Sequence, residues 1–97
     1  MEEFLRPHRR LGYDHDALAV YLYNRGAYPI AESEFKRAVW LNPYEIKFKI
    51  HLALCLYKLG FFIESAKLAE DILKIKPQDE DIKKLLDILN TKTSGKI

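Results

Sequence analysis

Residues 18–29 read LAVYLYNRGAYP, and residues 52–63 read LALCLYKLGFFI. The two stretches share Leu, Ala, Leu, Tyr and Gly at matching places, so that Leu18 corresponds to Leu52 and Gly26 to Gly60. A sixth identity follows, because Pro43 and Pro77 have the same separation. Identities at helical spacing that are followed by turn residues indicate an internal repeat. Each copy of the repeat is therefore predicted to hold two helices joined by a glycine turn.

The repeat divides the chain into one unit over residues 12–45 and a second over residues 46–79. In the first unit, Asp14 is expected to cap a helix, and Gly26 is expected to provide the left-handed conformation at its end. Pro29 then opens a second helix, because proline is tolerated in a first turn. The second unit repeats this plan, with helices predicted over residues 46–59 and 63–75.

Amphipathic spacing continues after the second unit, where a final helix is predicted over residues 79–90. A stack of helix pairs needs at its end a helix with one apolar side and a polar outer side. Residues 80–90 are therefore interpreted as a capping helix. Residues 1–11 are interpreted as an N-terminal arm and residues 91–97 as a mobile tail. The side chains expected in the core are Leu18, Leu22, Leu52, Leu56, Phe35 and Leu85.

Composition places limits on the class of protein. A length of 97 residues allows one small domain, and a net charge of +2 is too weak to indicate nucleic-acid binding. No run of apolar residues is long enough to span a membrane, so no membrane insertion is expected. Cys55 is the single cysteine, which excludes an internal disulfide and favours a cytoplasmic location with a buried, inert thiol.

The repeat resembles the tetratricopeptide repeat (TPR) family, whose unit of about 34 residues is a helix-turn-helix. The residues that carry the resemblance are His15-x2-Leu18-Ala19-x2-Leu22, Ala31-x3-Phe35 and Pro43, then Lys49-x2-Leu52-Ala53-x2-Leu56, Ser65-x3-Ala69 and Pro77. His15 and Lys49 replace the leading aromatic residue of the family pattern. The resemblance implies an all-α superhelix of two repeats with a capping helix.

In that family the first helices of successive pairs line a concave groove, and partners bind there. Carried over to this chain, the resemblance implies a groove lined by Tyr13, Val20, Tyr23, Asn24, Ile50, His51, Leu54, Tyr57, Lys58 and Lys84. Aromatic anchors with a polar rim are typical of surfaces that bind a peptide or a helix. Tyr23 and Tyr57 are expected to be the principal anchors. The alternative interpretation is that these side chains only pack within the protein.

The TPR proteins that hold the carboxylates of chaperone tails use a clamp of Lys, Asn and Arg residues. The matching positions here carry Asp16, Val20, His51, Lys84 and Ile88. An acid and aliphatic groups cannot replace cationic donors to a carboxylate. Chaperone-tail binding is therefore disfavoured.

No motif in the sequence indicates catalysis, a cofactor or a metal. His8, His15 and His51 have no Cys or His at ligand spacing, and the serines have no nucleophile-elbow context. A basic cluster is formed by Arg6, His8, Arg9 and Arg10, but nearby acidic residues weaken its field, so RNA binding is the less favoured hypothesis.

Three further aromatic side chains, Trp40, Tyr44 and Phe61, occupy places where the family generally shows polar residues. An exposed apolar surface of this kind is unusual on a monomer, so these residues are candidates for a second interface. Trp40 is expected to be at least partly exposed in an isolated monomer. The sequence thus favours a non-catalytic adaptor or assembly component that binds a peptide, a helix or a subunit surface. A self-assembling homo-oligomer is the alternative.

Overall fold

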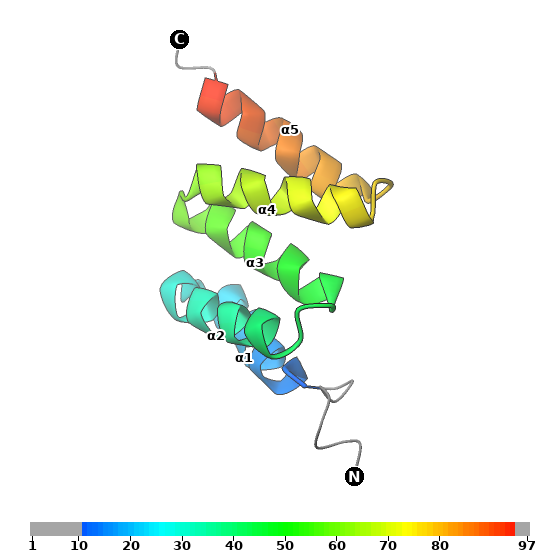
Figure 1. Ribbon diagram of the computed structural model, residues 1–97. Helices are drawn as coiled ribbons and strands as arrows, with labels where there is room; N and C mark the ends of the chain where they lie inside the picture. Colours follow the sequence, from blue (N-terminus) through cyan, green and yellow to red (C-terminus); the bar gives the residue numbers. More distant parts are fainter. Residues whose placement is uncertain (1–10, 95–97) are drawn as a thin grey trace.

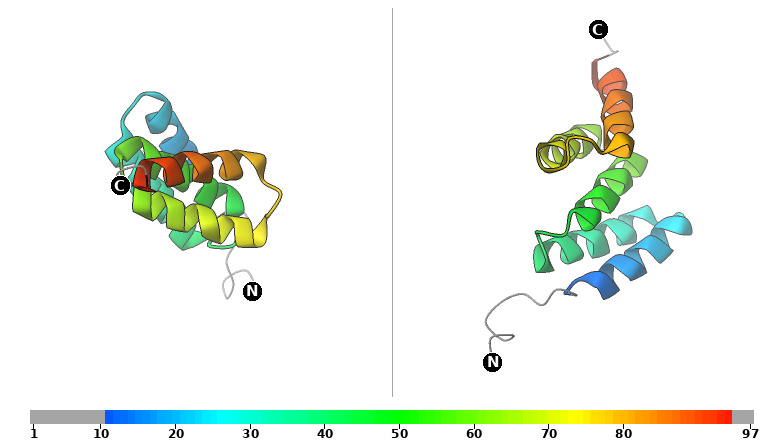
Figure 2. Two further views of the ribbon diagram at one scale, coloured as in Figure 1. Left: turned by 90° about the horizontal axis from the view of Figure 1, so that it is seen from above. Right: turned by 90° about the vertical axis from the view of Figure 1, so that its right-hand side faces the viewer.

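The computed structural model describes residues 11–94 as a succession of helices: α1 (Tyr13–Asn24), α2 (Tyr28–Leu41), α3 (Ile46–Leu59), α4 (Phe62–Ile75) and α5 (Glu80–Ser94). No strand occurs within this part of the chain, so the all-α prediction is confirmed. Each helix packs on the next, and α1 with α2, α3 with α4, and α5 follow one another along an elongated stack (Figure 1). Its helices turn about the long axis instead of lying in one plane (Figure 2).

The predicted arm and tail fall largely outside the described residues. The arm is described only at Leu11, which is exposed, and nothing in the structure tests the rest of it. Of the tail, the described part is helical, because α5 continues to Ser94 where the sequence predicted an end at Asn90. The prediction was wrong here because residues 91–94 contain neither glycine nor proline, so nothing in them stops the helix. The Thr91 hydroxyl donates to the Asp87 carbonyl at 3.1 Å, a bond made within the helix itself.

The turns within the two helix pairs form as the sequence predicted. Gly26 and Gly60 have φ values of +83° and +86°, the left-handed conformation that ends α1 and α3. Pro29 lies in the first turn of α2. The prediction that Asp14 caps α1 was wrong, because the residue at the N-cap is Gly12 and Asp14 lies inside the helix.

Gly12 holds the beginning of α1 against the other helices. Its φ is +91°, and a Cβ atom there would lie 3.0 Å from the Ala38 carbonyl oxygen and 3.0 Å from Cε2 of Phe48. Only glycine combines this backbone conformation with so close an approach. Gly12 lies at the boundary of the first repeat, and the repeat pattern predicted no role for it.

Two groups of buried side chains form the core, one between the helix pairs and one beneath α5. Phe35, Leu52, Leu56 and Leu85 are buried as expected, and Leu22 is half-buried. Leu18 is 47% exposed, so its predicted burial was wrong. Its repeat equivalent Leu52 packs against the preceding helix pair, whereas Leu18 lies on the outer side of α1.

Phe48 is fully buried and was missed by the sequence analysis. Its ring meets the Tyr13 ring edge-on, with 4.8 Å between centroids. Because Phe48 lies one helical turn before Leu52, the spacing of the α3 stripe was the signal that could have found it.

The second helices of the two pairs, α2 and α4, carry their large and small core residues in opposite order. Phe35 and Ala38 of α2, and Ala69 and Ile72 of α4, are all buried. The first repeat has the large residue one turn before the small one, and the second repeat has the reverse order. The total side-chain volume therefore stays nearly constant. Ser65, where the first repeat has Ala31, is also buried, and its hydroxyl donates to the Ala53 carbonyl at 2.7 Å.

Two glycine substitutions separate backbone conformation from close packing. Gly26→Ala introduces a Cβ into open space, so we expect only the cost of the left-handed conformation, about 1–2 kcal/mol. Gly12→Ala has the same conformational cost and also pushes Ala38 and Phe48 away from residue 12, so it should cost at least about 1 kcal/mol more. Urea unfolding followed by far-UV circular dichroism measures both. Equal losses would contradict the close approach at Gly12.

Candidate functional site

The first helices of the successive pairs and α5 form one continuous hollow face. One cavity of about 180 Å³ is lined by Val20, Tyr23, Asn24, Phe35, His51 and Leu54. A second of about 340 Å³ is lined by Tyr23, Ile50, Leu54, Tyr57, Lys58, Asp81, Ile82, Lys84, Leu85 and Ile88. Tyr23 and Leu54 line both cavities, so the two adjoin. We call their combined lining the groove.

Every residue that the sequence assigned to the groove, except Tyr13, lines one of the two cavities. The structure adds Phe35, whose buried ring lies at the floor, and a row on α5 formed by Asp81, Ile82, Leu85 and Ile88. The helical spacing of these α5 residues could have identified them from the sequence. Phe35 was harder to identify from the sequence, because it lies on α2, the second helix of its pair. It reaches the groove only because α2 packs beneath α1 and α3.

The two tyrosines expected to be anchors, Tyr23 and Tyr57, pack against the turns of their own helix pairs. The rings of Tyr23 and Tyr28 lie 5.2 Å apart between centroids, and their repeat equivalents Tyr57 and Phe62 lie 5.8 Å apart. Burial raises the pKa of the Tyr23 hydroxyl above its ordinary value. Tyr23 and Tyr57 therefore pack internally and line the groove at the same time. Truncating either to Ala would weaken the fold together with any binding.

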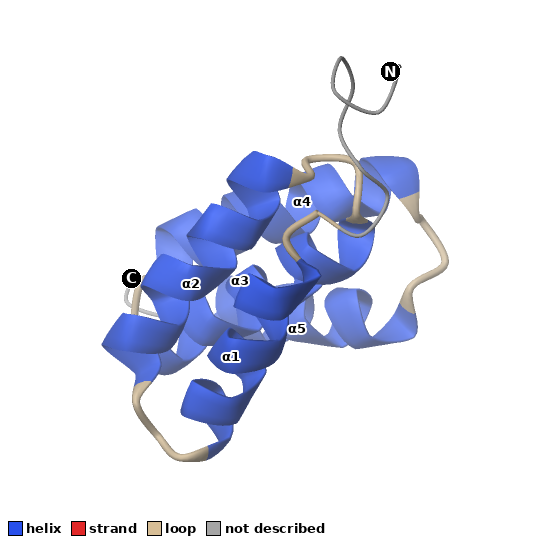
Figure 3. Cartoon of the chain, turned by 90° about the horizontal axis from the view of Figure 1, so that it is seen from below, coloured by secondary structure: helices blue, strands red, loops and turns tan. Residues whose placement is uncertain are grey.

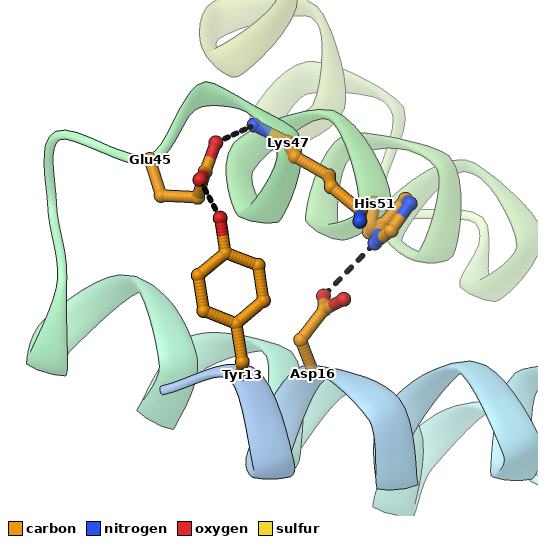
Figure 4. A network of polar contacts seen from close by, with 5 residues as sticks. All are labelled: Tyr13, Asp16, Glu45, Lys47 and His51. Carbon is orange, nitrogen blue, oxygen red and sulfur yellow. Dashed lines mark hydrogen bonds and ion pairs between the residues drawn. The ribbon is translucent and has the colours of Figure 1, made fainter. Parts of the chain in front are cut away.

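A polar side-chain contact joins α1 to α3 at one side of the groove (Figure 4). Asp16, on α1, is 4% exposed, and its Oδ1 lies 2.9 Å from Nδ1 of His51 on α3. The His51 ring also lies against the Phe35 ring, with 5.6 Å between centroids. A buried carboxylate needs such a partner, so this contact fixes the spacing of α1 and α3. His51 lines the groove, whereas Asp16 lies beneath it.

Tyr13 does not line either cavity, so its assignment to the groove is corrected. Its hydroxyl donates to one oxygen of Glu45, whose other oxygen accepts from the Lys47 backbone N–H at 3.2 Å (Figure 4). The Lys47 ammonium lies 5.7 Å from the centre of the Tyr13 ring. Tyr13 was misplaced because it lies in the first turn of α1, beside the loop that leads into α3. Tyr13 thereby connects the first turn of α1 to the N-terminus of α3.

All three aromatic residues proposed as a second interface are exposed, and Phe61 lies apart from Tyr44. Trp40 and Tyr44 are 79% and 86% exposed, and Phe61 is 45% exposed. Tyr44 precedes α3 and Phe61 follows it, so the length of that helix, about 21 Å, separates them. The connections before and after α3 lie on opposite sides of the stack in Figure 1.

Models of known protein families and curated protein sequences give no match to the chain. Among residues 11–94, no group of three or more His, Cys, Asp and Glu side chains is placed to hold a metal ion. The described helices are too short or too polar to cross a membrane.

The Tyr13–Glu45 contact predicts a pH dependence. The hydrogen bond from Tyr13 lowers the pKa of Glu45 below its ordinary value of 4.5. A lowered pKa stabilises the fold above the unfolded pKa, and this contribution is lost as pH falls through the folded pKa. In Tyr13→Phe, we expect the Glu45 carboxyl, followed by NMR, to titrate at higher pH. Tyr44→Phe, next to Glu45 in sequence but exposed, should leave it unchanged. An unaltered titration in Tyr13→Phe would show that the bond is not formed.

Burial raises the pKa of the Cys55 thiol from 9.0 to about 11. Thiolate is the reactive form, so about a hundredfold less of it exists at pH 8 in the folded chain than in the unfolded chain. We expect iodoacetamide to label Cys55 much more slowly in buffer than in urea. As pH rises from about 9 towards 11, the unfolded chain loses its proton first, so stability should fall. Equal labelling rates would show an exposed thiol.

Proposed function

We propose that the groove binds a short apolar segment of a partner protein that carries an acidic side chain, and that the protein acts as a non-catalytic adaptor or assembly component. The observation that supports this most directly is the continuous hollow over α1, α3 and α5, with apolar and aromatic side chains along it. Apolar side chains that enter it would remove their surface from water, at about 25 cal/mol per Å².

The charges at the rim favour an acidic partner. Lys58 and Lys84 are exposed and line the larger cavity, which has Asp81 as its one acidic residue. A carboxylate on the bound segment can pair with either lysine at the edge of the apolar floor. Rim charges of this kind mainly direct association and select partners, while the apolar floor supplies affinity.

We further propose that the chain is a member of the TPR family. Three features support this: the internal repeat that relates residues 12–45 to residues 46–79, the left-handed glycines at equivalent turns, and the equivalent pairs Tyr23–Tyr28 and Tyr57–Phe62. The buried pair of Asp16 and His51 occupies positions where chaperone-tail binders carry donors to a carboxylate. This supports a partner other than a chaperone tail. We place the function in the cytoplasm because the only thiol is a reduced, buried cysteine.

A library of displayed random peptides, selected against the full chain, tests the proposal. We expect the selected peptides to combine apolar residues with an acidic one, and to bind in fluorescence anisotropy. The double variant Lys58→Glu, Lys84→Glu reverses the rim charge and should weaken binding at least about tenfold, since like charges then face each other. Lys67→Glu makes the same kind of change on the exposed side of α4 and should have no effect.

The groove proposal fails if the selected peptides bind the double variant and the parent equally. Leu54→Arg gives an independent check, because Leu54 lines both cavities and a long charged side chain there obstructs each of them. Circular dichroism confirms that each variant remains helical, which separates lost binding from lost structure.

A further inference from the structure

Four repeat positions carry the contact between each helix pair and the helices before it. In α3 these positions are Phe48, Leu52, Cys55 and Leu59. The last three belong to or pack against the core beside α2, and Phe48 is buried next to Gly12. In α5 the first three of the corresponding positions are Ile82, Leu86 and Leu89, and they pack against α4. Steps of four, three and four along the chain form one stripe along a helix.

The same stripe on α1 is exposed. It consists of Asp14, Leu18, Tyr21 and Arg25, each located one repeat before its α3 counterpart. Leu18 and Tyr21 are 47% and 57% exposed, and the Arg25 guanidinium lies 5.3 Å from the centre of the Tyr21 ring. Seen from below, α1 and α2 lie in front of the other helices (Figure 3). We call these four residues the outer stripe.

The far end of the described stack has a different character. On the side of α5 that faces away from α4, Asp87, Asn90 and Thr91 are exposed, and Asp87 stands at the repeat position of the buried Ala53. A polar surface is poorly suited to cover Leu18 and Tyr21. The outer stripe therefore finds no complement on α5 of another copy, which argues against head-to-tail association.

The outer stripe is, however, complementary to itself when reversed. Asp14 and Arg25 lie equally far from the midpoint between Leu18 and Tyr21. If a second α1 lies antiparallel about that midpoint, each Asp14 meets the partner copy's Arg25 position, and each Leu18 meets a Tyr21. A two-fold axis makes such a contact twice in one interface.

We propose that two copies of this chain associate through the outer stripes of α1, antiparallel and related by a two-fold axis. The contact is short, because α1 is 12 residues and about 18 Å long. Interfaces of this small size are typically transient, so we expect a dimer that dissociates on dilution. This inference does not depend on the proposed function, because the groove and the outer stripe occupy different sides of α1.

Sedimentation velocity of the full chain over a dilution series, at low salt, measures the association. Asp14→Arg places Arg against Arg25 at both ends of the dimer, and Arg25→Asp places Asp against Asp14. Each variant alone should dimerise at least about tenfold more weakly than the parent protein. An equal mixture of the two variants forms heterodimers in which opposite charges meet at both ends, so the mixture should recover association.

Recovery in the mixture separates a lost contact from a lost fold, since a misfolded variant would not be rescued by the other. Glu70→Arg is the matched control, an exposed acid on α4 away from the outer stripe, and it should associate as the parent does. A parent protein that stays monomeric at all concentrations overturns the proposal. Dimerisation that Asp14→Arg leaves unchanged, or a mixture that does not recover, also overturns it, because the contact then lies elsewhere or has another register.

Discussion

The rest of the structure depends on the close packing of Phe48 against the first helix pair. Its ring lies in full burial beside Gly12, Ala38 and the edge of Tyr13. A side chain at Gly12 would push this ring away, and with it the beginning of α3. Since the groove lies between α1, α3 and α5, its width follows from how closely α3 approaches α1 at this point. The shape of the groove thus depends on one steric constraint outside it.

Polar contacts then select one arrangement of helices that already pack well. The Asp16–His51 pair joins α1 to α3, and the Ser65 hydroxyl joins α4 to the Ala53 carbonyl. An unpaired buried carboxylate or hydroxyl is costly, so a shifted register would lose these contacts and leave the groups unsatisfied. Apolar packing alone tolerates small shifts more readily. These two contacts therefore specify the geometry of the groove as well as stabilising it.

The helical period divides α1 between two roles. Val20 and Tyr23 line the groove, whereas Leu18 and Tyr21 lie on the outer stripe. Positions one or two places apart along a helix point in different directions, so the two proposed contacts, with a partner segment and with a second copy, use different sides of α1. Substitutions on one face should leave the other undisturbed.

The sequence alone determined the helices and their glycine turns, because these follow from the spacing of residues close together in the chain. The face that forms the groove was indicated by the resemblance to the TPR family. The tertiary structure decided which faces are covered. Leu18 and Leu52 are the same residue at the same repeat position, yet one is 47% exposed and the other 7%. Periodicity records which side of a helix is apolar, but burial depends on whether another helix lies against that side. For the same reason Tyr13, assigned to the groove by repeat position, instead binds Glu45 in the loop beside it.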